Sequence, residues 1–147
     1  MGLYARNLEP IKYRSKTLGI AFFYPHGGRV VEEDAVLLVH PNLHGTGQTL
    51  LRVFAIPDRP DVKTVLEEMV AASRERNPNI ETVLVTRQFG ELKSSGYLAT
   101  DAEGATETHV LRHRGGALVI KLRRGESTVI GRVELFRMFG ETLRLLR

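Results

Sequence analysis

The histidines are the first residues whose side chains could do chemistry, and the chain has five of them. His40 and His44 flank a Pro-Asn-Leu segment, and His26 lies in an earlier turn. If these three rings converged in a pocket, they could serve a hydrolase as general acid and base. His109 and His113 are four residues apart, which places them on one face of a strand. Since neither pair has a third ligand at a zinc-like spacing, we predict no metal site and assign His109 and His113 to the partly buried core.

Other catalytic patterns give little support for an enzyme. Residues 44–49 (HGTGQT) lack the lysine of a phosphate loop and the third glycine of a dinucleotide loop. No GxSxG elbow occurs, so we assign Ser94 to the start of a strand and Ser127 to a helix N-cap. Glu32 to Asp34 form an acidic cluster typical of a solvated turn. The chain has no cysteine, which excludes thiol nucleophiles and Cys-ligated metals. We therefore predict a protein that is not an enzyme and needs no cofactor.

The most informative segment is the basic stretch from Thr106 to Arg124. Gly115 and Gly116 are predicted to supply the two positive-φ positions of a tight hairpin turn. Alternation then puts His109 and its apolar neighbours on one face of the hairpin. The other face carries four cations that form a candidate binding patch: Arg112, Arg114, Lys121 and Arg123.

This basic patch has a functional and a structural interpretation. Its charges suit an acidic protein, phosphate groups or a lipid surface. Alternatively, charged side chains protect the edge of a sheet from unwanted pairing, or their stems cover a neighbouring helix. The sequence leaves both interpretations open.

Length and composition are those of an ordinary globular protein. The chain has 147 residues, of which 42% are hydrophobic and 26% are charged, and we expect one domain over residues 1–147 with its core in 10–146. The net charge of +4 is small for a nucleic-acid binder, and tryptophan is absent, so nucleic-acid binding is disfavoured. No apolar run is long enough for a signal peptide or a membrane span, which favours a cytoplasmic protein. A trimmed exported form, and the choice between monomer and homodimer, stay open.

The pattern of apolar residues predicts the order of the elements. Strands are expected at 11–14, 19–24, 30–31, 35–39, 50–56, 82–89 and 93–100, followed by the two strands of the hairpin. A helix is expected from Val62, capped by Asp58 or Asp61 and ended by Asn77-Pro78. A second helix is expected from Thr128 to about Leu146. These elements predict an α+β fold: a single-domain α/β/α sandwich with a mostly antiparallel sheet of about six to seven strands, one helix inserted mid-chain and one C-terminal helix.

The opening apolar strand carries a family resemblance. Residues 19–25 (GIAFFYP) resemble the "G-hydrophobic-F-x-YP" strand of the PsbP/Mog-like superfamily. The helix from Val62 to Ala72, the segment 96–100 (GYLAT), the Gly-Gly hairpin and the terminal helix are similar to the elements that follow in those proteins. Relatives often carry a tryptophan shortly after the YP, where this chain has residues 28–30 (GRV). The resemblance covers roughly residues 10–146 and implies an α/β/α sandwich used mainly for binding, with no shared catalytic residues.

The resemblance and the basic patch together favour a non-catalytic binding or adaptor protein. It would dock a protein partner, acidic in character, through a face or rim of the sheet. One alternative is a carrier or chaperone for an apolar ligand or a hydrophobic helix. That alternative requires an open groove lined by four rings: Phe22, Phe23, Tyr24 and Phe54. The third hypothesis is a hydrolase that uses the cluster of three histidines named first.

Overall fold

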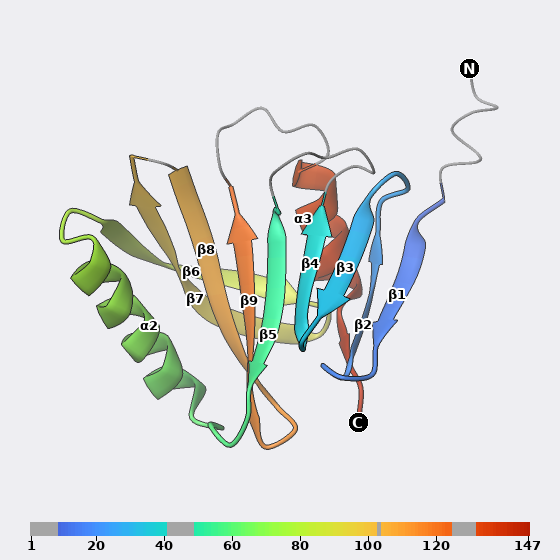
Figure 1. Cartoon of the computed structure of the whole chain (residues 1–147), viewed down its shortest axis with the longest axis horizontal. Coiled ribbons are helices and arrows are strands. Elements are labelled where there is room, and N and C mark those ends of the chain that lie inside the picture. The colour runs from blue at the N-terminus through green and yellow to red at the C-terminus, as the bar shows by residue number, and fades with distance from the viewer. Residues whose placement is uncertain (1–8, 41–48, 103, 125–131) are drawn as a thin grey trace.

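A computed structural model describes residues 9–40, 49–102, 104–124 and 132–147 of the chain. Figure 1 shows how the elements of that part are arranged. The strands are β1 (Ile11–Ser15), β2 (Ile20–Tyr24), β3 (Arg29–Glu33), β4 (Val36–His40), β5 (Leu51–Ile56), β6 (Glu81–Phe89), β7 (Leu92–Asp101), β8 (Gly104–His113), β9 (Gly116–Arg123) and β10 (Arg144–Leu145). The helices are α2 (Val62–Arg76) and α3 (Arg132–Thr142).

The strands form two sheets. The larger sheet has seven strands in the order β3-β4-β5-β9-β8-β7-β6, and its neighbours pair antiparallel. The smaller sheet has the order β1-β2-β10. The predicted α+β fold with a mostly antiparallel sheet is confirmed. The separate small sheet is a finding that the pattern of local apolar runs did not predict, because it depends on β2 pairing with the distant β10.

The two faces of the seven-stranded sheet are covered unequally (Figure 1). On one face, the small sheet and α3 enclose the larger of two apolar clusters, which includes Phe22, Leu51, Ile120 and Phe139. On the other face, α2 packs against β7 and β8 over a much smaller cluster that includes Val65 and Val119. We call the first the closed face and the second the open face. The closed face holds most of the core.

The helix α2 forms as the sequence predicts. Asp61 is its N-cap, and the carboxylate accepts hydrogen bonds from the backbone N–H of Thr64 at 3.3 Å and from its hydroxyl at 2.6 Å. The helix ends at the C-cap Asn77, directly before Pro78. Its inner side buries Val65 and Ser73 against the sheet. The capping residues and the apolar periodicity of the sequence were therefore sufficient to predict this helix.

The turn of the basic hairpin is one residue earlier than predicted. Arg114 and Gly115 have the positive φ values, 52° and 74°, whereas Gly116 is the first residue of β9 and pairs with His113. The reason lies outside the hairpin: a Cβ on residue 116 would lie 2.5 Å from the carbonyl oxygen of Ile56. Gly116 is therefore needed for close approach to β5 and not for the turn. The two faces of the hairpin are those predicted, because the error shifts the register by an even number of residues.

The C-terminal helix is shorter than predicted. It ends at Thr142, and the predicted continuation to about Leu146 is wrong. The Thr142 hydroxyl donates to the carbonyl of Met138 at 2.6 Å and accepts from the backbone N–H of Phe23 at 2.9 Å. After this contact the chain leaves the helix and pairs with β2 as β10. The predicted N-cap Ser127 lies outside the described residues.

Neither helix is long and apolar enough to cross a membrane in the ranges that the structure describes.

Candidate functional site

A chain of buried polar side chains crosses β6, β7 and β8 on the closed face. The Ser94 hydroxyl lies 2.9 Å from Nδ1 of His109, and Nε2 of the same ring lies 2.6 Å from Oε2 of Glu107. Because a carboxylate only accepts hydrogen bonds, the Nε2–H of His109 donates to Glu107. Arg87 donates to the same carboxylate through Nε at 2.6 Å and Nη2 at 3.1 Å. Serine, histidine and carboxylate thus follow the order of a nucleophilic triad.

This triad-like chain is closed to any substrate. Ser94 is 3% exposed and His109 is 0% exposed. The ring of Phe89 packs edge-on against His109 at 5.1 Å between centroids. Neither Ser94 nor His109 lines the two cavities described below. We conclude that the chain of hydrogen bonds is structural and ties three strands together.

Glu107 stays charged although it is buried, and Gly96 leaves space for the histidine that binds it. Burial alone would raise the pKa of this carboxyl, but the hydrogen bonds from His109 and Arg87, and their charges, hold it well below its usual range. Gly96 makes room for the histidine ring, since a Cβ there would lie 2.6 Å from Nδ1 of His109. The same Cβ would lie 2.2 Å from the backbone oxygen of Thr108. His109 lies in the core as the sequence predicts, but no pattern in the sequence indicated that Glu107 would bind His109 or that Arg87 would bind Glu107.

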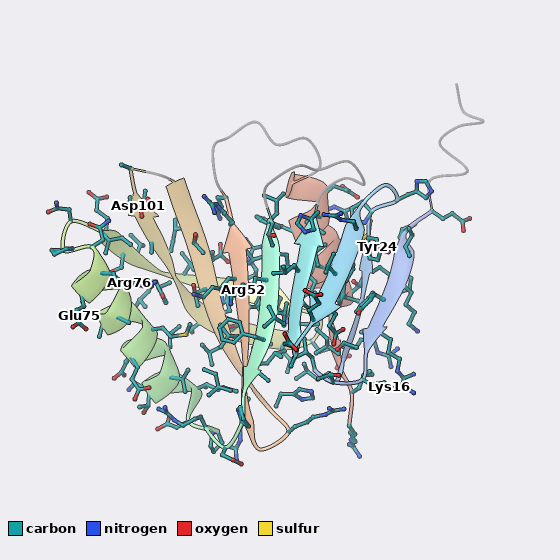
Figure 2. All side chains as sticks on the ribbon, in the orientation of Figure 1. Lys16, Tyr24, Arg52, Glu75, Arg76 and Asp101 are labelled. Atoms are coloured by element: carbon teal, nitrogen blue, oxygen red, sulfur yellow. The ribbon has the colours of Figure 1, made fainter. Side chains whose placement is uncertain are left out.

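Two adjoining cavities lie on the open face. One, of about 320 Å³, lies between the last turn of α2 and strands β7 to β9. The other, of about 470 Å³, lies over β4, β5 and β9. Thr106, Lys121 and Arg123 line both cavities, so the two are parts of one depression. Figure 2 shows Arg76 on α2 and Arg52 on β5 on this same side of the sheet.

Four cations border this depression, which we call the basic trough: Arg52, Arg76, Lys121 and Arg123. Among the described residues that line the two cavities, Asp101 is the only one with a carboxylate. None of the four cations forms a salt bridge within the part of the chain that the structure describes. Burial, and then the positive charges of Arg52 and Arg76, lower the pKa of Lys121. The trough therefore holds positive charge that an incoming anion would stabilise.

The structure brings together two of the four cations of the predicted patch. Lys121 and Arg123 lie side by side in the trough. Arg112 lies near the hairpin tip and lines neither cavity. Arg114 is in the turn, where its Nη1 donates to the carbonyl oxygen of Lys16 at 3.0 Å and so joins the hairpin to the small sheet. The structural alternative of edge protection does not apply, because β8 and β9 are central strands.

Arg52 and Arg76 were missed because no local pattern connects them with the hairpin. Arg52 is directly opposite Lys121 in the pairing of β5 with β9, and its guanidinium lies 5.1 Å from the ring centroid of Phe54. Arg76 reaches the trough from the last turn of α2. A signal for Arg52 existed in the sequence: it is a charged residue within the otherwise apolar run 50–56.

The histidines proposed for a hydrolase differ in their environments. His26 is exposed in the turn between β2 and β3, and His40 is buried at the end of β4. His44 lies outside the described residues, so the three-histidine cluster stays untested. Among the residues that the structure describes, no group of three His, Cys, Asp or Glu side chains could hold a metal ion.

The aromatic rings proposed to line an apolar groove lie on different faces. Phe22 is 1% exposed and belongs to the core of the closed face. Its neighbour Phe23 points away from that core and is 37% exposed. Phe54 packs on the open face beneath Arg52. These rings share no common groove.

The architecture of this chain is similar to that of solved structures. No family model matches the sequence, and neither does any curated protein. The structure is similar to the solution structure of cyanobacterial PsbP (CyanoP) from Synechocystis sp. PCC 6803, with a TM-score of 0.62 over 94% of this chain and 93% of that one, at 14% sequence identity. This chain has a PsbP-like fold. A crystal structure from Bacteroides thetaiotaomicron matches with a TM-score of 0.51 and 11% identity over 92% of this chain but 48% of that one.

The PsbP-like fold agrees with the resemblance found in the opening strand. At these sequence identities the similarity concerns the fold and not the activity. The Mog-like part of the predicted resemblance stays a prediction.

Proposed function

We propose that this chain is a non-catalytic binding protein that docks an acidic protein partner through the basic trough. The observation that carries the proposal is the meeting of four cations that form no salt bridge within the described residues. Charge that the described part of the chain does not neutralise is available to steer and hold an acidic surface. The PsbP-like fold, which the sequence resemblance associates with binding, is consistent with this role.

The chemistry of the trough indicates how a partner would contact it. Lys121 and Arg123 lie at its centre, beside the hydroxyl of Thr106, and can donate hydrogen bonds to carboxylates. Arg52 and Arg76 flank the centre from β5 and α2. The second cavity also has apolar walls, Val36 and Leu38, which would accept an apolar side chain beside the acidic one. A protein segment with neighbouring acidic and apolar residues fits this arrangement.

Site-specific photo-crosslinking in extracts of the native cell tests the proposal. A crosslinking residue at position 123 is expected to capture a defined partner, and capture is expected to fall steeply with added salt because the contact is ionic. A crosslinker at position 12, on the exposed β1 strand of the small sheet, is the control and is expected to capture nothing in common with position 123.

A matched pair of variants separates specific docking from general basicity. Changing all four trough cations to Gln removes four charges from the open face. Changing Lys12, Arg14, Lys16 and Arg144 to Gln removes four from the exposed surface of the small sheet. We expect only the trough variant to lose the partner. Loss with both variants, or with neither, would contradict docking at the trough.

A further inference from the structure

The two edges of the seven-stranded sheet are protected to different degrees. Three of the five residues of the edge strand β3 are charged, and its Glu32 accepts hydrogen bonds from the small sheet at 2.6 and 2.8 Å. The other edge strand, β6, has nine residues and exposes Val83 (59%) and Leu84 (80%) at its centre. These are the two most exposed large apolar side chains in the part of the chain that the structure describes. An edge of this kind is a template for a further strand.

We propose that β6 is a dimer interface, in which it pairs antiparallel with β6 of a second copy of this chain about a two-fold axis at Leu84. The interface would be isologous: where residue i of the first copy faces residue j of the second, residue j of the first copy also faces residue i of the second. It would extend the sheet across both copies. The proposal goes beyond the proposed function and does not depend on the basic trough.

The sequence of β6 supports one register of this pairing. Along an edge strand, the backbone N–H and C=O groups that face away from the sheet belong to every second residue. Two residues that lie directly opposite each other in an antiparallel pair must both point these groups toward the partner strand or both away from it. When two copies of β6 pair, the two-fold axis therefore passes through a residue and not between two residues. Centring on Leu84 places Glu81 opposite Arg87, Thr82 opposite Thr86 and Val83 opposite Val85. Each of these cross-strand pairs is favourable: an opposite-charge pair, a hydroxyl pair and a β-branched apolar pair.

The two neighbouring registers lack this complementarity. Centring on Val83 would place Glu81 opposite Val85, and centring on Val85 would place Val83 opposite Arg87. Both leave a charge facing an apolar side chain. The register about Leu84 is therefore the one that charge and apolar matching favour.

Arg87 can serve the interface without leaving its buried partner. Its Nε and Nη2 bind Glu107, and its side chain is 25% exposed at the strand edge. Its Nη1 donates no hydrogen bond to any described residue, so this donor is available to Glu81 of the second copy.

One strand pair buries less area than a standard stable interface, so we expect a dissociation constant in the micromolar range, roughly 1–100 µM. Sedimentation velocity of the full chain between about 5 and 500 µM is expected to show a monomer–dimer equilibrium. Leu84→Lys is expected to weaken it at least tenfold, because two ammonium groups would meet at the axis. Leu92→Lys, at an exposed apolar position outside β6, is the matched control and is expected to leave it unchanged. Circular dichroism establishes that both variants are folded.

A cysteine scan tests the register directly, because the chain has no cysteine of its own. Leu84→Cys is expected to form a disulfide-linked dimer on mild oxidation, since residues at the axis lie within disulfide distance. Thr86→Cys is the control: in the proposed register the two copies of residue 86 are four residues out of alignment, about 14 Å apart. A chain that stays monomeric at 500 µM, Leu84→Lys that dimerises like the parent, or Thr86→Cys that crosslinks as fast as Leu84→Cys would each overturn the proposal.

Discussion

The closed and open faces of the seven-stranded sheet differ in whether their buried charges have partners of opposite charge among the described residues. On the closed face, the carboxylate of Glu107 is 2% exposed and is surrounded by hydrogen bonds from His109, Arg87 and Arg124. On the open face, half-buried Lys121 has like charges as neighbours and no salt bridge to any described residue. A buried charge with a full set of partners serves the fold, whereas a partly buried charge without partners is a feature that binding can use.

The largest expected effect concerns Glu107. We expect Glu107→Gln to lower the free energy of unfolding by about 2 to 3 kcal/mol, because it leaves Arg87 and His109 without the carboxylate that they contact. Urea denaturation measures this change. Glu91→Gln, at an exposed position, is the control and is expected to stay within about 0.5 kcal/mol of the parent. Equal changes in the free energy of unfolding would mean that the buried carboxylate of Glu107 stabilises the fold no more than the exposed one of Glu91.

The same carboxylate predicts how stability depends on pH. The pKa of Glu107 is lowered in the folded protein, whereas the pKa of a glutamate in an unfolded chain is about 4.3. Its contribution is therefore complete above that unfolded pKa and is lost progressively as the pH falls toward the folded pKa. We expect the stability difference between the parent and Glu107→Gln to shrink between pH 6 and pH 3 in urea denaturation. A difference that stays constant over this range would contradict the assignment.

A smaller effect is expected at Gly96. Gly96→Ala would place a methyl group against the backbone oxygen of Thr108 and the ring of His109, so we expect a loss of about 2 kcal/mol. Ser95→Ala, at the exposed neighbour, is the control and is expected to change stability little. Thermal unfolding of both variants decides whether the closed face is as tightly packed as the distances indicate.

The smallest effect has the opposite sign and lies in the basic trough. Lys121→Met removes a partly desolvated charge from beside Arg52 and Arg76, so we expect Tm to rise by about 1–2 °C in the absence of a partner. Lys12→Met, at an exposed position of β1, is expected to leave Tm unchanged. A clear fall in Tm for Lys121→Met would show that the lysine stabilises the fold, and the contrast between the two faces would then fail.

Parts of the site could be predicted from the sequence, and parts could not. Alternation along 106–124 correctly separated His109 from Lys121, because side-chain direction in a strand depends only on parity. The hairpin turn was misplaced by one residue, because Gly116 is required by its contact with Ile56 of a distant strand. Arg114, which the sequence placed in the basic patch, bonds instead to the turn after β1. Such contacts between segments far apart in the chain leave no local pattern.

The sequence by itself determined the order and type of the elements from β1 to α3, the end of α2 at Asn77 and the faces of the central hairpin, and it narrowed the N-cap of α2 to Asp58 or Asp61. These features follow from interactions over a few residues, which apolar periodicity and capping residues encode directly. Only the tertiary structure decided that β9 lies beside β5, which puts Arg52 opposite Lys121, and that Glu107, His109 and Ser94 meet. It also decided that β6 is an edge with Leu84 exposed. Strand neighbours that are distant in sequence are selected by the packing of the whole sheet, and both proposed surfaces depend on that selection.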